Sequence, residues 1–283
     1  MIPLIFLIIS TVINIVLDYL FVVPMNMGIQ GVAYATVIAQ IFSAVGIVIY
    51  SVAKLPQVRI NKKHMIFKKQ MFSRIASFSL LASVQQSIMN FGILMIQGLV
   101  NSFGVNVMAA FAAGVKIESF VYMPMQDFGN AFSTFIAQNK GARNQERIKV
   151  GIKSTIKVIA IYSLIISALV MVFAGPLLKI FIDATEVQIL DIGMGYVYVV
   201  APFYILIGYL FMFYGLYRGL GKSGISIILT IASLGTRVIL AYSLSAIASI
   251  GLVGIWWSIP IGWVLADLLG LILLLKHYKW ETK

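Results

Sequence analysis

Eight long apolar stretches, separated by short polar ones, make up most of this sequence. Each stretch is long enough for a helix, rising 1.5 Å per residue, to cross a bilayer core of about 30 Å. They cover roughly residues 2–23, 28–53, 75–101, 107–137, 150–174, 188–216, 223–247 and 252–275. Because the period-two alternation of strands is sustained nowhere, the pattern predicts an all-α polytopic membrane protein with eight transmembrane helices. The fourth and sixth stretches exceed a straight span, and Pro124 and Pro202 inside them predict kinks.

Composition supports this interpretation. Hydrophobic residues make up 61% of the 283 positions and charged residues only 11%, whereas soluble domains carry about 25% charged residues. A conventional soluble enzyme is excluded, and no phosphate-binding loop, zinc-hydrolase or serine-hydrolase motif occurs. Cysteine is absent, which excludes disulfides and thiolate metal sites. We predict a protein that is not an enzyme and needs no cofactor.

The net charge of +12 is distributed unevenly along the chain. After even-numbered apolar stretches lie 18 of the 21 Lys and Arg residues, a distribution typical of cytoplasmic loops. Both termini are therefore expected in the cytoplasm, and the charge is explained without nucleic acid. The longest basic connection, 54–74, divides the chain into 1–53 and 75–283. Such a run can also bind anionic lipid, but a topology signal within a linker is the simpler interpretation.

An internal repeat relates the first two apolar stretches to the last two. They align without a gap at an offset of 223, which places Gly28 and Gly31 on Gly251 and Gly254. Because the shift is six helices, the two repeats are expected to run parallel. Residues 1–53 would then be the last two helices of a first six-helix lobe, and 75–283 a complete second lobe. On this hypothesis, four helices precede Met1 in the complete protein.

Polar residues inside the first pair of apolar stretches predict a cation site. Asn14 lies one helical turn before Asp18, and Thr36 on the returning helix lies within ~5 Å of Asp18 in depth. Carboxylate, amide and hydroxyl oxygens together suit Na⁺, or Asp18 alone can hold a proton. The alternative is ordinary hydrogen bonding between the helices, and the pattern alone does not decide between them. Apart from possible Na⁺ at Asp18, no metal is predicted.

Further buried polar residues predict a substrate cavity in the second lobe, because each charge in mid-membrane costs at least ~2.5–3.5 kcal/mol. The candidates for its lining are Gln85, Gln86, Glu118, Tyr122, Met123 and Asp127. Lys116 and Glu118 point about 200° apart on a helix, so we expect Glu118 to face the cavity and Lys116 another helix. Arg237 is expected to be a structural polar residue with an acidic or carbonyl partner. Asp267 is expected near the cytoplasmic end, within reach of water. For all of these residues, structural packing is the competing interpretation.

Several short motifs occur in order along the whole chain. They include Asn14-x-x-Leu17-Asp18, Gly28-Ile-Gln-Gly31, Lys116-Ile-Glu118, Phe128-Gly-Asn-Ala-Phe-Ser-Thr-Phe-Ile-Ala-Gln138, Tyr217-Arg218-Gly219, Arg237-Val-Ile-Leu-Ala-Tyr242 and Gly251-Leu-Val-Gly254-Ile-Trp-Trp. Together they resemble the bacterial branch of the multidrug and toxic compound extrusion family. The resemblance implies helices 5–12 of a twelve-helix transporter that exchanges Na⁺ or H⁺ for drugs or organic cations. It also implies a cation site built from Asn14, Asp18 and Thr36.

The sequence departs from that family pattern at two places. An acid on the family's first helix, which completes the cation site, is not in this chain. Some relatives also carry acids on the helices matching stretches three and six; here stretch three carries Gln85 and Gln86 instead, and the membrane part of stretch six has no acid. Glu118 stands where relatives often carry an acid.

We therefore expect a gradient-driven exporter of the bacterial cytoplasmic membrane, working by alternating access between two lobes. One alternative is a flippase for lipid-linked precursors, which would favour a cavity rich in Arg and Lys; Lys116 and Arg237 are the only deep cations. The other is an inactive fragment that lacks four N-terminal helices.

Overall fold

The structure, a computed structural model, describes residues 2–55 and 66–277. Within these ranges the chain is helical and contains no strand, and eight helices are long and apolar enough to cross a membrane. This confirms the predicted fold class. The chain divides into two compact units, Met1–Phe72 and Ser73–Lys283. Much of the basic connection, residues 56–65, lies outside the described residues, so the predicted role of 54–74 stays a prediction.

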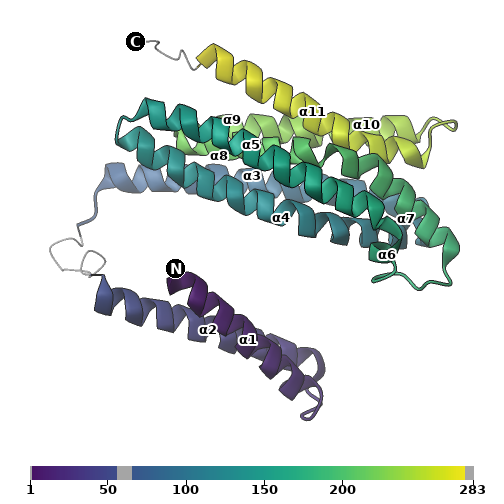
Figure 1. The fold of residues 1–283 in the computed structure, drawn as a ribbon, viewed down its shortest axis with the longest axis horizontal. Coiled ribbons are helices and arrows are strands. Elements are labelled where there is room, and N and C mark those ends of the chain that lie inside the picture. Colours follow the sequence, from purple (N-terminus) through teal and green to yellow (C-terminus); the bar gives the residue numbers. More distant parts are fainter. Residues whose placement is uncertain (1, 56–65, 278–283) are drawn as a thin grey trace. The chain divides into compact units, whose positions relative to one another are not determined.

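The first unit is an antiparallel pair formed by α1 (Ile2–Val22) and α2 (Gly28–Lys54) (Figure 1). Small residues of α2 form the contact surface, since only Gly31, Ala35 and Ala39 are buried on it. The Ser10 hydroxyl donates to the Ala39 carbonyl across the pair at 2.7 Å. A Cβ at Gly31 would lie 2.8 Å from the Cβ of Phe21, so glycine is needed for this close approach.

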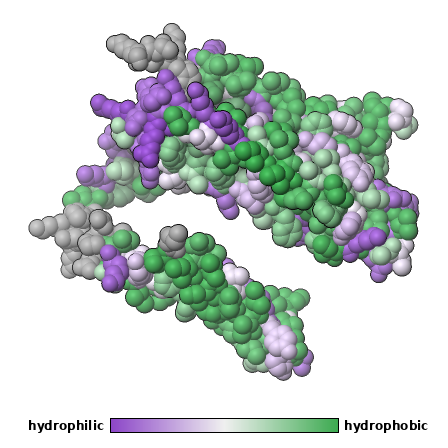
Figure 2. Space-filling view, in the orientation of Figure 1, coloured by the Kyte–Doolittle hydropathy of each residue, from purple (hydrophilic) through white to green (hydrophobic). Residues whose placement is uncertain are grey.

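The second unit is a helical bundle (Figure 1). Its helices are α3 (Lys69–Asn101), α4 (Val105–Gly141), α5 (Gln145–Val172), α6 (Ala174–Leu178), α7 (Val187–Val200), α8 (Tyr204–Gly219), α9 (Ser223–Thr230), α10 (Thr236–Ser245) and α11 (Leu252–His277). In Figure 2 its flanks are largely hydrophobic and hydrophilic residues gather mainly at its two ends, as expected for a bundle that crosses a membrane. Glycines bring α4 and α8 together: a Cβ at Gly215 would collide with the carbonyl oxygen of Gly129.

Several helices extend beyond the predicted apolar stretches. α3 begins at Lys69 rather than at 75, α4 ends at Gly141 rather than 137, and α5 begins at Gln145 rather than 150. Hydrophobicity marks only the part of a helix that lies in hydrocarbon. Backbone hydrogen bonding carries the helix further into the polar region, where charged side chains are tolerated.

Two interruptions shape the helices of the second unit. At Pro202 a short 3₁₀ segment, η3 (Ala201–Phe203), separates α7 from α8, in agreement with the predicted kink. A π-helical turn, η4 (Ile231–Gly235), separates α9 from α10 and was not predicted. Pro124 lies inside a continuous α4. Among these breaks only η4 lies next to one of the predicted polar residues, Arg237.

The internal repeat appears again in the packing. A Cβ at Gly31 would meet Phe21 and Met27, and a Cβ at Gly254 would meet Leu244 and Ile250. These partners are separated by the same offset of 223 as the glycines themselves. Gly28 and Gly251, the two turn glycines, have positive φ angles of 56° and 51°. The α1–α2 pair and the α10–α11 pair therefore share this glycine contact beside the turn.

Candidate functional site

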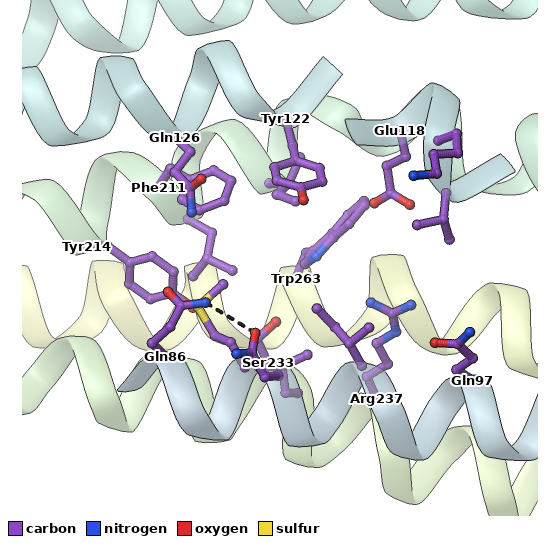
Figure 3. Close-up of a pocket in the computed structure, with 18 of the residues that line it drawn as sticks. Gln86, Gln97, Glu118, Tyr122, Gln126, Phe211, Tyr214, Ser233, Arg237 and Trp263 are labelled. Atoms are coloured by element: carbon purple, nitrogen blue, oxygen red, sulfur yellow. Dashed lines mark hydrogen bonds between the residues drawn. The ribbon is translucent and has the colours of Figure 1, made fainter. Parts of the chain in front are cut away.

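A cavity of about 440 Å³ lies inside the second unit (Figure 3). It is bounded by residues of α3, α4, α8, η4, α10 and α11. Its polar lining includes the amides Gln86, Asn90, Gln97 and Gln126, and its aromatic lining includes Phe111, Tyr122, Phe211, Tyr214 and Trp263. Three charged residues also line it, Lys116, Glu118 and Arg237. Amides, aromatic rings and a few charges around one cavity are typical of binding sites for small organic molecules, which makes this cavity the candidate site.

Glu118 is fixed at one end of the cavity by a neighbouring helix. It is buried, and one of its carboxylate oxygens accepts a hydrogen bond from the hydroxyl of Tyr196 on α7. Gly114, one turn earlier on the same face of α4, leaves room for the Tyr196 ring, which a Cβ there would strike. Trp256 packs edge-on against the same ring, with centroids 5.0 Å apart. Glu118 thus has a defined position, as expected for a functional carboxylate.

Lys116 lies where sequence reasoning did not expect it. It lines the same cavity as Glu118 instead of facing another helix. The backbone directions of the two residues do differ, but the long aliphatic stem of lysine carries its ammonium group around the helix surface. Among the described residues, no hydrogen-bond or ion-pair partner holds that ammonium group.

Arg237 lines the cavity as well. It was expected to be a structural polar residue with an acidic or carbonyl partner, and its side chain points toward the acid Glu118 (Figure 3). Its Nε atom is buried and has no hydrogen-bond partner. The π-helical turn just before it shifts the helical register, which a sequence-based count of 3.6 residues per turn cannot foresee.

The other predicted cavity residues divide into three groups. Gln86 and Tyr122 line the cavity, and the Gln86 amide donates to Asn90 at 3.3 Å. Gln85 does not line it; its amide is buried and donates to the Thr230 hydroxyl at 3.1 Å. Met123 and Asp127 are exposed and lie outside this cavity, because they fall on another side of α4.

Asp267 on α11 differs from its expected environment. Both carboxylate oxygens are buried and neither has a hydrogen-bond partner, so water does not reach it in this structure. α11 was expected to bring this residue near the cytoplasmic end, but the ring-rich helix α8 packs against α11 and covers it. Its place in the sequence gave no signal of this burial.

The predicted cation residues lie along the contact between α1 and α2. The Ser10–Ala39 and Phe21–Gly31 contacts set an antiparallel register in which facing residue numbers sum to about 50. Asn14 is therefore level with Thr36, and Asp18 lies one turn away. Asp18 Oδ1 and Asn14 Nδ2 are both buried without a partner, whereas the Thr36 hydroxyl donates to the Val32 carbonyl of its own helix at 2.9 Å. Asp18 thus has an unused acceptor oxygen, whereas the unused atom of Asn14 is its amide nitrogen, a hydrogen-bond donor.

Comparison with known proteins identifies the family. The family model MatE matches residues 79–243, more than half of the chain. The chain belongs to the MatE family. This MatE chain is 27% identical to the probable multidrug resistance protein YoeA of Bacillus subtilis, over 98% of the chain and 61% of that protein. It is 24% identical to the probable multidrug resistance protein NorM of Thermotoga maritima, over 95% of the chain and 58% of that protein.

A solved structure shows the same fold. The outward-facing conformation of a multidrug resistance MATE family transporter superposes with a TM-score of 0.88 at 24% identity, covering 95% of this chain and 60% of that one. The MatE chain thus spans about three-fifths of the length of the relatives it matches. These relatives are membrane transporters and not enzymes, in agreement with the prediction.

Proposed function

We propose that this MatE chain forms helices 5–12 of a twelve-helix antiporter that exports small molecules and draws on a Na⁺ or H⁺ gradient. The family and the multidrug resistance proteins among its relatives support export of drugs. The length of those relatives supports four further helices before the first unit. The distribution of basic residues supports a bacterial cytoplasmic membrane with both termini inside.

The observation that carries the coupling proposal is the unused carboxylate oxygen of Asp18. A buried polar atom without a partner is costly in an apolar medium, so a bound ion or proton would relieve that cost. Asn14 lies one turn away on the same helix, and its neutral carboxamide oxygen could bind Na⁺ beside the Asp18 carboxylate. A cation held here in only one conformation would bias alternating access between inward and outward states.

Transport in membrane vesicles tests this proposal. The chain is expressed alone and, in parallel, behind the first four helices of Bacillus subtilis YoeA. Export of fluorescein and of the cationic methyl ester of tetramethylrhodamine is followed after imposing a Na⁺ or a pH gradient. We expect gradient-driven export of at least one dye, and a loss of tenfold or more in Asp18→Asn.

The matched control is Asp183→Asn, which removes an exposed acid outside the membrane-spanning helices. It should export like the parent. Unchanged export by Asp18→Asn at equal expression would reject coupling at this residue. Export of neither dye in either form would support the inactive-fragment alternative.

A further inference from the structure

We infer that the cavity of the second unit takes a planar aromatic molecule that carries an anionic group, rather than a simple organic cation. The inference rests on the proposed export function and names its substrate class. The charges that the structure brings together around one cavity carry it. Lys116 and Arg237 contribute two positive groups, and Glu118 is the one acidic residue among the cavity's lining.

The acid offsets only one of the two positive charges, because Arg237 points toward Glu118 while the exposed Lys116 has no acidic partner among the described residues. Glu118 already accepts a hydrogen bond from Tyr196 on the side away from the cavity's other lining. Among the described residues, neither the Lys116 ammonium nor the Arg237 guanidinium donates a hydrogen bond, and Arg237 Nε is buried. The charged lining therefore carries one net positive charge, which favours an anion over a cation.

The remainder of the cavity suits a flat ring. Figure 3 shows Glu118, Arg237 and Gln97 toward one end, Tyr122 and Trp263 between, and Tyr214 and Gln126 toward the other end. Aromatic side chains offer faces and edges for stacking, and the amides donate or accept hydrogen bonds at the ring's substituents. A carboxylate or sulfonate at the charged end and a ring in the middle would use both parts.

The internal repeat gives independent support. At the offset of 223, Arg237 occupies the position of Asn14, one of the proposed cation ligands. A guanidinium fixed at this position supplies a permanent positive charge where the first unit has a neutral amide. The glycine contacts beside the two turns are equivalent, so the exchange changes charge at a corresponding position of the repeat. The second unit is thus suited to an anionic partner.

Equilibrium binding to the purified chain tests the inference. Fluorescein and the methyl ester of tetramethylrhodamine share a planar xanthene ring but carry opposite charge, and fluorescence anisotropy reports their affinities. We expect fluorescein to bind at least tenfold more tightly. Lys116→Gln and Arg237→Gln should each weaken fluorescein binding about tenfold, and Glu118→Gln should strengthen it several-fold.

Two control variants separate the effect of the cavity charges from a general loss of charge or of folding. Lys153→Gln removes an exposed charge on α5 and should leave both affinities unchanged. Arg237→Lys keeps the charge and should retain the preference for fluorescein, so it separates charge from folding if Arg237→Gln is unstable. Equal or tighter binding of the cationic dye, an equal loss in Lys153→Gln, or binding of neither dye would overturn the inference.

The outcome is separable from that of the proposed function, because binding needs no ion gradient. Asp183→Asn, an exposed acid outside both sites, should bind both dyes like the parent. If the vesicle assay shows no coupling at Asp18 but fluorescein still binds more tightly, only the proposed ion site is rejected. If coupling is found but fluorescein does not bind more tightly, only the proposed substrate class is rejected.

Discussion

The helix pairs α1–α2 and α10–α11 share a glycine contact beside the turn but carry different chemistry. In both, a glycine near the turn lies against equivalent partners, Phe21 for Gly31 and Leu244 for Gly254. The polar positions differ, since Asn14 and Asp18 in the first pair correspond to Arg237 and Ala241 in the second. Small residues fix how two helices approach in lipid, where apolar burial gives little preference for one neighbour over another. The remaining positions are therefore free to change function without changing the packing.

The two pairs also differ in how closely their helices approach where Ser10 faces Ala39 in the first pair and Ser233 faces Gly262 in the second. The Ser10 hydroxyl bonds to the carbonyl of Ala39 in the first pair. At the equivalent level of the second pair, a Cβ at Gly262 would lie only 2.5 Å from the carbonyl oxygen of Ser233. The second pair is thus tighter beside the cavity, and the first pair leaves room for a methyl group.

The largest effect is expected when the first pair is given the charge of the second. Asn14→Arg would place a guanidinium one turn from Asp18, where it would pair with the carboxylate and take the place of the coupling cation. Gradient-driven export in vesicles should fall tenfold or more. Asn14→Gln, which keeps the amide, should lose much less, and equal losses in both variants would argue against a charge effect.

A smaller but clear effect is expected from Gly262→Ala. The new methyl group would meet a backbone oxygen that cannot move aside, and overpacking of this kind costs about 1–3 kcal/mol. The melting temperature of the purified chain should fall by several degrees. The reciprocal change Ala39→Gly should lower it less, since the first pair has no such collision; a larger fall there would contradict the difference in approach.

Matched changes at Gly31 and Gly254 test whether the two pairs share the same glycine contact. Gly31→Ala and Gly254→Ala would bring a Cβ to 2.8 Å and 2.6 Å from equivalent side chains, so both should reduce the melting temperature by comparable, modest amounts. Gly195→Ala on α7, where nothing lies within 4 Å of the added Cβ, should have no such effect. A change confined to one pair would show that their packing is not equivalent.

The smallest effect concerns the single hydrogen bond across the first pair. Ser10→Ala removes the 2.7 Å bond to Ala39 and should destabilise the pair by about 0.6 kcal/mol, the average for such bonds in membrane bundles. Thr11→Ala is the matched control, because the Thr11 hydroxyl bonds only within its own helix, to Leu7. A stabilisation by Ser10→Ala would indicate that the bond is not formed in lipid.

Side chains that reach across helices account for the failures of sequence reasoning. Gln85 and Gln86 are adjacent, and only the structure separates them into a buried partner of Thr230 and a cavity residue. Lys116 and Arg237 enter one cavity because of a flexible stem in one case and a π-helical turn in the other. Asp267 gave no sign of its buried oxygens, since burial depends on what the neighbouring helix carries.

The sequence by itself determined the eight helices, the membrane environment and the repeat between the first and last helix pairs. These follow from local properties, because length and hydrophobicity decide which segments leave water and small residues mark where helices touch. Tertiary structure alone decided that Lys116, Glu118 and Arg237 share one cavity and that Tyr196 holds the carboxylate. Those contacts join three helices far apart in the chain, α4, α7 and α10, and their geometry depends on crossing positions and register that no single helix encodes.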